Sequence, residues 1–566
     1  MRMPKLRGIL VLGFAAFGLV RGDPPVGDTS AKDFAAGRII GLPPFLVAER
    51  FAGGHLPLYG SVAGLEVLSY AEAGATGKFV ESFLLRSAEL HELFPDALEF
   101  RQSLPLTMIL IDPRMEKAMR QEMVDALRDS DSDGISPIPQ MTLWDDEAAS
   151  MLYVISPHSH EDRPFADIRW KDKVDYKDIY LTQKYVASLL EKRTPPLPFW
   201  FQYVISRLYQ DIVWTDNEVE IPKVRWRGDP AGTRPDWTVA PIDRFLLGPF
   251  GGADEGTREQ VESWYSQGVL FVRWALDDPS HSRRDRLWSF VDASSREPVT
   301  AALFRKCLGM DFSDLTRELS EYLPTAVARP LALVRAESIA VPKLELRLAT
   351  NSQISRIEGN WECEETKYVK RAHPGLMQDY LDRAGIDLVS AHQSGVTDSP
   401  FLAVLGLYDS DIGKEAEARP LLEEAVGAQV ARPAIYVKLA HIRYQEDLAK
   451  QPDGRLDAGQ VLAILGLLRE SCRYAPAQVE TYTLALEVWN HAAVAPVRED
   501  MAFLENGVAF FPRDGALVAG AARLGQRAGF KQEALEIVDR GEQYAAPDSS
   551  LHRELASLRV EIAGPN

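Results

Sequence analysis

The amino-acid sequence predicts an α+β region in the first part of the chain and an all-α region in the second. Short apolar runs at 65–70 and 105–112 have the length and composition of buried strands, and a helical pattern at 76–94 lies between them. A third strand is predicted at 151–155, and the order strand, helix, strand, strand is typical of an α+β domain. From about residue 356 to the end, nearly every segment has helical periodicity.

The composition is that of an acidic globular chain with several domains. At about 150 residues per domain, 566 residues predict three to four domains. With 63 Lys and Arg residues against 82 Asp and Glu residues, the formal net charge is −19. This charge argues against nucleic acid and anionic lipid surfaces as partners, because both need basic patches. Cys307, Cys363 and Cys472 lie far apart without a C-x-x-C pair, which predicts core thiols or a single disulfide and no cysteine zinc site.

The first 22 residues have the parts of a secretory signal peptide. Basic residues at 2, 5 and 7 precede an apolar run at 8–20, and Val20 and Gly22 permit cleavage before Asp23. The run is shorter than the roughly 20 residues that span a bilayer. We expect an exported protein, periplasmic or extracellular, with an uncleaved N-terminal anchor as the alternative and no other membrane contact. Residues 23–59 are rich in Gly and Pro and predict an extended lead-in.

The segment from about 175 to 325 predicts a series of helices. Asp175 or Asp178 can cap a helix that ends near Lys192, before the Pro-rich turn at 194–198. A second helix begins at Pro198, with apolar residues at helical spacing. Further helices are predicted at 258–277, 297–308 and 313–322, and Gly309 is a predicted C-cap.

The segment 175–212 holds two predicted helices joined by this turn, and the second opens with Leu197-Pro198-Phe199-Trp200-Phe201. The pair resembles the core of the gluzincin (peptidase MA-type) metalloproteases. In that family the first helix carries H-E-x-x-H, with two zinc-binding histidines on one helical face and a Glu that activates water. The second helix supplies a Glu as third ligand. The resemblance covers about 60–325 and implies a zincin-like fold; the alternative is a helical hairpin without this ancestry.

The positions that would carry the zinc chemistry are all replaced. When the apolar pair at 189–190 is aligned with the family, Gln183 and Ala187 stand at the histidine positions and Lys184 stands at the general base. Tyr203 stands at the third ligand. None of these side chains is a usual zinc ligand, and Lys184 adds a positive charge. The resemblance therefore implies an inactive pseudo-peptidase domain with no catalytic residues, metal or cofactor.

The helical region at 356–566 carries parts of a helix-turn-helix repeat, after a predicted linker at 326–355. Small and apolar residues recur where one helix would cross the next, and the segment at roughly 400–546 resembles tetratricopeptide arrays. Such arrays bind protein segments and have no chemistry of their own. The alternative is an ordinary helical bundle. The residues that carry the resemblance are Leu405, Gly406, Ala418, Leu422 and Ala425, then Tyr436, Leu439, Ala440, Ala475 and Pro476, and finally Ala522, Gly529, Ala534 and Val538.

Three other groups of residues are candidate sites. The acidic loop from Asp129 to Asp133, followed by Gly134, matches the start of an EF-hand calcium loop, but Gln140 stands where a bidentate Glu is needed, so a solvated loop is favoured. A second candidate is the segment with His158, His160, Glu161 and Asp162. Two side chains two positions apart in a loop can share a metal, but no third ligand is identifiable, which favours a polar surface turn. Seven tryptophans could line a sugar cleft, although core packing is favoured; they are Trp200, Trp214, Trp226, Trp237, Trp264, Trp274 and Trp288.

The sequence thus predicts an exported, non-catalytic scaffold that binds a protein or peptide partner through its helical repeats. One alternative is an unconventional hydrolase or metal enzyme that uses an unidentified site. A second alternative is a carbohydrate-binding surface made by the tryptophans.

Overall fold

The computed structural model describes residues 57–62, 64–95, 98–111, 140–144, 147–155, 183–214, 218–226, 238–247, 258–334, 339–372, 374–545 and 549–564. Several predictions fall outside these ranges: the signal peptide, nearly all of the lead-in, the Asp129–Asp133 loop, the His158 segment, Trp237, and the capping residues Asp175 and Asp178. The described chain forms two compact units that alternate along the sequence. The first unit takes residues 1–84, 102–180 and 342–442, and the second takes 85–101, 181–341 and 443–566.

The first unit is built on a six-stranded mixed sheet with the order β4-β5-β3-β2-β1-β9. The three central strands β2, β3 and β5 run parallel, and the outer strands pair antiparallel. Leu68 of β2 pairs with Ile109 of β3, which pairs with Leu152 of β5, so these apolar side chains share one face. The strands are β1 (Leu58–Val62), β2 (Leu65–Ser69), β3 (Leu106–Ile111), β4 (Gln140–Trp144), β5 (Ala149–Val154) and β9 (Arg347–Leu348).

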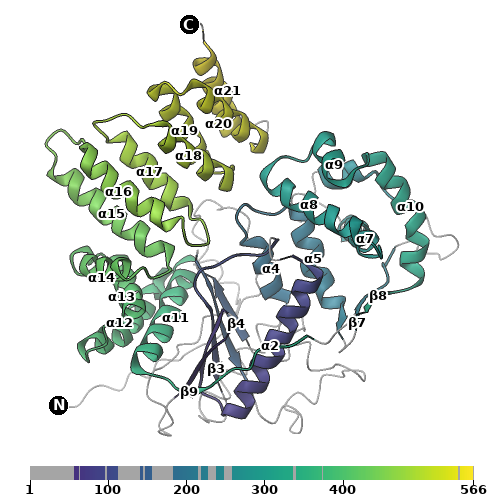
Figure 1. Ribbon diagram of the computed structural model, residues 1–566, viewed down its shortest axis with the longest axis horizontal. Helices are drawn as coiled ribbons and strands as arrows, with labels where there is room; N and C mark the ends of the chain where they lie inside the picture. Colours follow the sequence, from purple (N-terminus) through teal and green to yellow (C-terminus); the bar gives the residue numbers. More distant parts are fainter. Residues whose placement is uncertain are drawn as a thin grey trace. The chain divides into compact units, whose positions relative to one another are not determined.

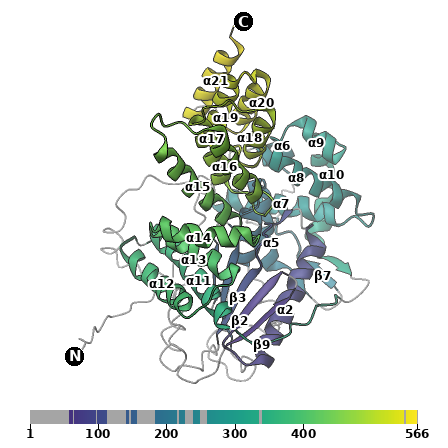
Figure 2. The ribbon, with the colours of Figure 1, turned by 60° about the vertical axis from the view of Figure 1, so that its left-hand side comes forward.

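Helices cover both faces of this sheet. On one face lies α2 (Ala73–Leu93), the crossover between β2 and β3, whose Phe79 ring lies 4.8 Å from that of Tyr153. On the other face lies α11 (Asn351–Ala372), which packs Ile357 and Trp361 into the core formed by Leu68, Ile109 and Leu152 (Figures 1 and 2). Both faces of the central strands are therefore buried, which explains their continuous apolar sequences.

The structure divides the chain differently from the predicted boundaries at 325 and 356. Residues 331–334 and 347–348 form strands β8 and β9 within the predicted linker, and β9 pairs with β1 at the edge of the sheet. The helix that follows completes the core of that sheet through Trp361. Strands of two to four residues leave little periodicity to detect, so a sequence pattern cannot distinguish them from a connector.

The second unit contains the predicted helical segment and a small sheet. Helices α4 and α5 pack together, as do α5 and α7, α7 and α8, and α8 and α9. The three-stranded antiparallel sheet has the order β6-β7-β8. These elements are α4 (Gln183–Glu191), α5 (Phe199–Asp211), β6 (Val213–Trp214), β7 (Glu218–Ile221), α6 (Ile242–Leu247), α7 (Arg258–Leu276), α8 (Ser282–Arg296), α9 (Ala301–Leu308), α10 (Phe312–Ala328) and β8 (Leu331–Val334).

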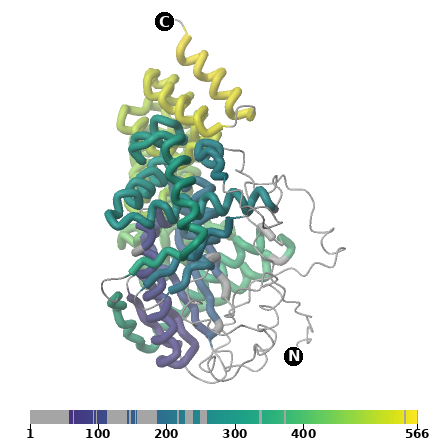
Figure 3. Tube along the Cα trace, turned by 90° about the vertical axis from the view of Figure 1, so that its right-hand side faces the viewer, coloured from purple at the N-terminus to yellow at the C-terminus, as the bar shows by residue number. Residues whose placement is uncertain are grey.

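From residue 351 onward the chain is helical, as predicted (Figure 3). In the first unit α11 packs against both α12 and α13, and α13 packs against α14. In the second unit α17 contacts both α16 and α19, α18 contacts α20, and α19 contacts α21. The helices are α12 (Met377–Gln393), α13 (Ser399–Asp411), α14 (Glu415–Gly427), α15 (Pro433–Lys450), α16 (Ala458–Ser471), α17 (Val479–Asn490), α18 (Arg498–Phe510), α19 (Gly515–Ala528), α20 (Lys531–Tyr544) and α21 (Ser550–Ala563), with a short 3₁₀ helix η3 (Pro374–Leu376) before α12.

Small residues lie where these helices cross, as the repeat pattern predicts. A Cβ atom on Gly406 of α13 would lie 2.9 Å from Leu422 Cδ2 of α14, and Ala418 and Ala425 are fully buried. In the later pair, a Cβ atom on Gly525 of α19 would lie 3.2 Å from the Cβ of Ala534 on α20. The backbones at these crossings are too close for larger side chains.

The predicted strands at 65–70, 105–112 and 151–155 and the helices at 76–94, 198–212, 258–277 and 313–322 are confirmed to within a few residues, except that the last continues to Ala328. The predicted C-cap is also confirmed, because Gly309 has φ 75° and its N–H donates to the Arg305 carbonyl after α9. The predicted helix at 297–308 is shorter, since α9 begins only after the N-cap Thr300, whose hydroxyl accepts from the Leu303 N–H.

Two glycines of the second unit test the close helix crossing. A Cβ atom on Gly507 of α18 would lie 2.4 Å from Cγ of Tyr482, whereas nothing lies within 4 Å of one on Gly466 of α16. We expect Gly507→Ala to destabilise the protein by about 1–3 kcal/mol through overpacking. The matched variant Gly466→Ala should gain up to about 1 kcal/mol from helix propensity. Thermal and urea unfolding of the two full-length variants measures both effects, and a neutral Gly507→Ala would contradict the crossing.

Candidate functional site

The positions aligned with the zinc ligands lie on the hairpin of α4 and α5. Gln183 and Lys184 open α4, Ala187 lies one turn later, and Tyr203 lies in the second turn of α5. Arg193 holds the turn between these helices, donating to the Pro195 carbonyl at 2.7 Å. The hairpin predicted from the sequence is therefore present over the described residues.

The third-ligand position is occupied by an aromatic side chain that contacts α7. The Tyr203 ring centroid lies 5.7 Å from that of Trp264 and 6.2 Å from that of Tyr265. Its hydroxyl accepts a weak 3.4 Å hydrogen bond from Arg207 Nη1, and Arg207 Nη2 donates to both carboxylate oxygens of Glu262 at 2.8 and 2.9 Å. Arg207 is thus already neutralised, and the arrangement joins α5 to α7 rather than leaving a ligand position open.

Metal binding has no support among the residues that the structure describes. Within those ranges, no three His, Cys, Asp or Glu side chains are placed to hold an ion. Ala187 has no donor atom, and the side chains of Gln183 and Lys184 lie outside the description. The three cysteines are free thiols.

We expect purified full-length protein to contain no stoichiometric zinc. The aligned residues Gln183, Ala187 and Tyr203 are not usual zinc ligands, and Lys184 adds a positive charge beside them. Elemental analysis after dialysis without chelator measures the metal content. One tightly held zinc ion per chain would contradict the pseudo-peptidase hypothesis.

Most of the tryptophans proposed for a sugar cleft pack in the core. Trp200, Trp214, Trp274 and Trp288 are buried, and Trp200 stacks on Phe271 with centroids 5.6 Å apart. Their ring faces are therefore not available to stack on a sugar. Trp226 and Trp264 are half-buried.

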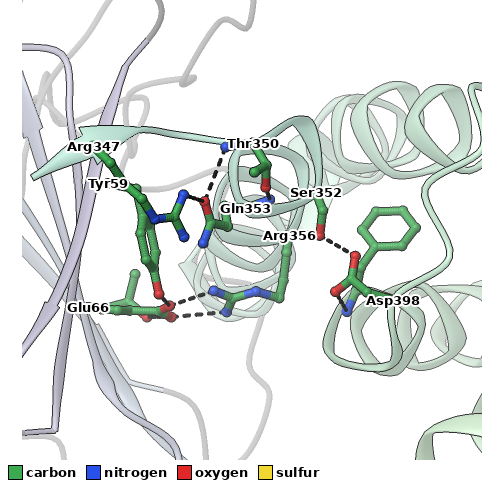
Figure 4. A network of polar contacts seen from close by, with 10 residues as sticks. Tyr59, Glu66, Arg347, Thr350, Ser352, Gln353, Arg356 and Asp398 are labelled. Atoms are coloured by element: carbon green, nitrogen blue, oxygen red, sulfur yellow. Dashed lines mark hydrogen bonds and ion pairs between the residues drawn. The ribbon is translucent and has the colours of Figure 1, made fainter.

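A polar network on α11 was not predicted from the sequence (Figure 4). Arg356 donates to both carboxylate oxygens of Glu66 on β2, at 3.0 Å for Nη1 and 2.5 Å for Nη2. Thr107 on β3 also donates to Glu66, at 2.9 Å, and Tyr59 on β1 donates at 3.5 Å. Burial, reinforced by the Glu66 charge, raises the pKa of the Tyr59 hydroxyl. This network joins three strands to α11, and sequence reasoning missed it because Glu66 and Arg356 lie 290 positions apart.

Removing the charge of Arg356 while Glu66 stays should lower the free energy of unfolding. Glu66 is 3% exposed, so Arg356→Met would leave a buried carboxylate without its cation. We expect a loss of about 3–5 kcal/mol of unfolding free energy. The double variant Glu66→Gln with Arg356→Met should recover most of it, because no buried charge then remains. Urea denaturation of both variants measures the difference, and equal stabilities would contradict a buried ion pair.

A second polar group lies between α11 and α12. Glu358, Glu362 and Glu365 follow one another at helical spacing on α11 and are each at most 4% exposed. Glu358 accepts a hydrogen bond from the Tyr70 hydroxyl, and Glu365 accepts one from Trp361 Nε1 at 2.6 Å. Burial raises the pKa of Glu358 to about 8 and that of Glu362 to about 10. Both carboxyl groups are therefore protonated at neutral pH.

An uncharged surface lies in the second unit, on α16 and the loop that follows α17. Residues 458–468 carry no charge in a chain of which 26% is charged, and Leu462 is 66% exposed. The loop at 491–497 is held beside the start of α16, because the Ala493 N–H donates to the Leu456 carbonyl at 2.8 Å. Its Val494 and Val497 are 42% and 56% exposed. We call Leu462, Ala463, Gly466, Val494 and Val497 the α16 patch.

The scan against family models and the search of curated proteins find no match to this chain. The described helices also include none with the length and hydropathy needed to cross a membrane. The function is therefore inferred from the chain's own residues.

Proposed function

We propose that this protein is an exported, non-catalytic scaffold whose helical region binds an apolar segment of a partner protein. The proposal extends the resemblance to an inactive gluzincin domain followed by tetratricopeptide-like repeats. The observation that carries it is the packing of alternate helices: α17 contacts α19, α19 contacts α21, and α18 contacts α20. Each helix pair covers the next, which is the construction of repeat arrays that bind protein segments.

The central helices of these stacks are buried nearly all round. Residues 401–410 of α13 are all buried, and α17 buries seven of its side chains. A helix that is apolar on every side belongs inside a larger assembly of helices. By contrast, α16 is equally apolar in sequence but leaves Leu462, Ala463 and Gly466 exposed. The α16 patch thus has the composition of a buried helix face without a covering element among the described residues, and exposed apolar patches of this kind mark interaction sites.

The buried tryptophans count against the carbohydrate-binding alternative. The replaced residues at the aligned zinc positions count against a peptidase of the parent class. No observation on the described residues favours a second function.

Site-specific crosslinking in the native cells tests the proposal. A photoreactive amino acid at position 462 should give one adduct of defined mass, because this side chain would lie in the interface. The matched control is position 560, where Val560 is 71% exposed on α21 among charged neighbours such as Arg559 and Glu561. We expect no defined adduct there.

A substitution provides the quantitative test. Leu462→Asp should weaken capture of the crosslinked partner at least tenfold, since it places a charge in an apolar interface, whereas Val560→Asp should leave it unchanged. Both side chains are exposed, so each variant should keep its thermal stability to within about 0.5 kcal/mol. Equal binding by the two variants, or no adduct at position 462, would overturn the proposed role of the α16 patch.

A further inference from the structure

The interface between α11 and α12 buries more acid than its basic groups can neutralise. Glu358, Glu362 and Glu365 face it from α11, and Asp387 faces it from α12. Arg383, one turn before Asp387, is the cation that acts on Glu362, Glu365 and Asp387, and its Nε lies 3.9 Å from Oε1 of Glu362. Three of the four carboxyl groups are buried, whereas Asp387 and Arg383 are half-buried, and one guanidinium cannot balance four ionised carboxylates there.

The hydrogen bonding of the cluster supports the same conclusion. Glu362 is completely buried, and its carboxyl oxygens have no donor among the described residues. A hydrogen bond shared by Glu362 and Asp387 lowers the pKa of Asp387 and needs a proton on one of the two groups. Oε2 of Glu365 and Oδ2 of Asp387 also have no hydrogen-bond partner there. Ionised carboxylates need donors to be stable inside a protein, whereas neutral carboxyl groups are less costly to bury.

We propose that the α11–α12 pair is a proton-held latch, which stays closed while Glu358 and Glu362 carry protons and opens when they lose them. Ionisation would place two negative charges on α11 beside Asp387 of α12. Arg383, the cation of α12 near them, already acts on Glu362, Glu365 and Asp387. Repulsion between α11 and α12 would then oppose their packing. This inference is independent of the proposed binding function.

The direction of the pH effect follows from the raised pKa values of these two groups. In the closed state they are about 8 for Glu358 and about 10 for Glu362, against an ordinary value of 4.5 toward which solvation in the proposed open state would return them. The latch is therefore fully stable below about pH 4.5 and is weakened as the pH rises through the closed-state values. For each group, every pH unit between 4.5 and its closed-state pKa shifts the equilibrium between closed and open forms about tenfold toward the open form.

Opening would uncover an apolar surface in the first unit. Ala384, Leu388 and Ala391 of α12 pack on Phe401 and Leu405 of α13, and a Cβ atom on Gly359 of α11 would lie 2.5 Å from Leu388. Detachment of α12 would expose these side chains together. Several other titratable and charged groups lie around the cluster. They are Tyr70 after β2, Cys363, Glu364, Lys367 and Tyr368 on α11, and Asp379 and Tyr380 on α12.

Pulsed hydrogen–deuterium exchange of the full-length protein tests the latch. Wild type is compared at the same pH with Glu358→Gln/Glu362→Gln, which cannot ionise and leaves the sequence of α12 unchanged. At about pH 9.5 we expect peptides from residues 377–393 to exchange at least tenfold faster in wild type. The difference between the two proteins should be smaller at about pH 6.5 and should disappear near pH 4.5, where both groups are protonated in the closed form. Peptides from α19, which belongs to the second unit, provide the control.

Equal exchange of α12 in the two proteins at about pH 9.5 would overturn the proposal. If the double variant does not fold, the wild type alone decides. The ratio of exchange in α12 to exchange in α19 should then rise at least tenfold between about pH 7 and pH 9.5, because the chemical rate cancels in the ratio. A constant ratio would equally overturn the latch.

Discussion

The architecture of the first unit depends on the burial of one helix, α11, against a sheet formed by residues almost three hundred positions earlier. Trp361 lies in the sheet core with Leu68, Ile109 and Leu152, and it cannot be placed there unless the rest of the helix is also drawn into the interior. The polar side chains on its other faces must then find partners inside the protein. Glu364 accepts from Ser150 on β5 at 3.0 Å and from Asn360 at 2.6 Å, and Arg356 pairs with Glu66.

The same constraint extends to the following helices. Arg432, after α14, donates to Glu147 at 2.7 Å and to Asn360 at 2.9 Å, so the loop before α15 is joined both to the sheet and to α11. These buried charges are retained although apolar replacements of similar shape are often as stable, and such pairs specify one arrangement among several apolar ones. Here they connect α11 to the sheet and the segment before α15 to both.

The proposed function depends on which described side chains serve packing and which are exposed. The α4–α5 hairpin resembles a peptidase core, but its described side chains serve packing: Tyr203 lies against Trp264 and Tyr265, and Trp200 lies against Phe271. Chemistry is thus not favoured at the place where the resemblance would put it. The exposed apolar side chains of α16, in contrast, have no structural role that requires exposure. We propose that the helical array binds a partner through this face and that the α11–α12 interface of the first unit responds to pH.

The sequence by itself determined the local features of this protein. The apolar runs of β2, β3 and β5, the helical periodicity of α5 and α7, and the left-handed glycine after α9 all depend on residues close together in the chain, and such signals can be detected without knowing the fold. The small residues Gly406, Ala418 and Ala534 also indicated helix crossings correctly, because close packing requires a small side chain whatever the partner helix is. Tertiary structure alone decided which segments belong together. Strand β9 has two residues, too few for a sequence pattern. The acidic stretch of α11 has the composition of a solvated helix face, and only the packing of Trp361 in the sheet core shows that it is buried. The pairing of Glu66 with Arg356 and the burial of Glu358 and Glu362 depend on contacts between distant parts of the chain, and no pattern within one segment contains that information.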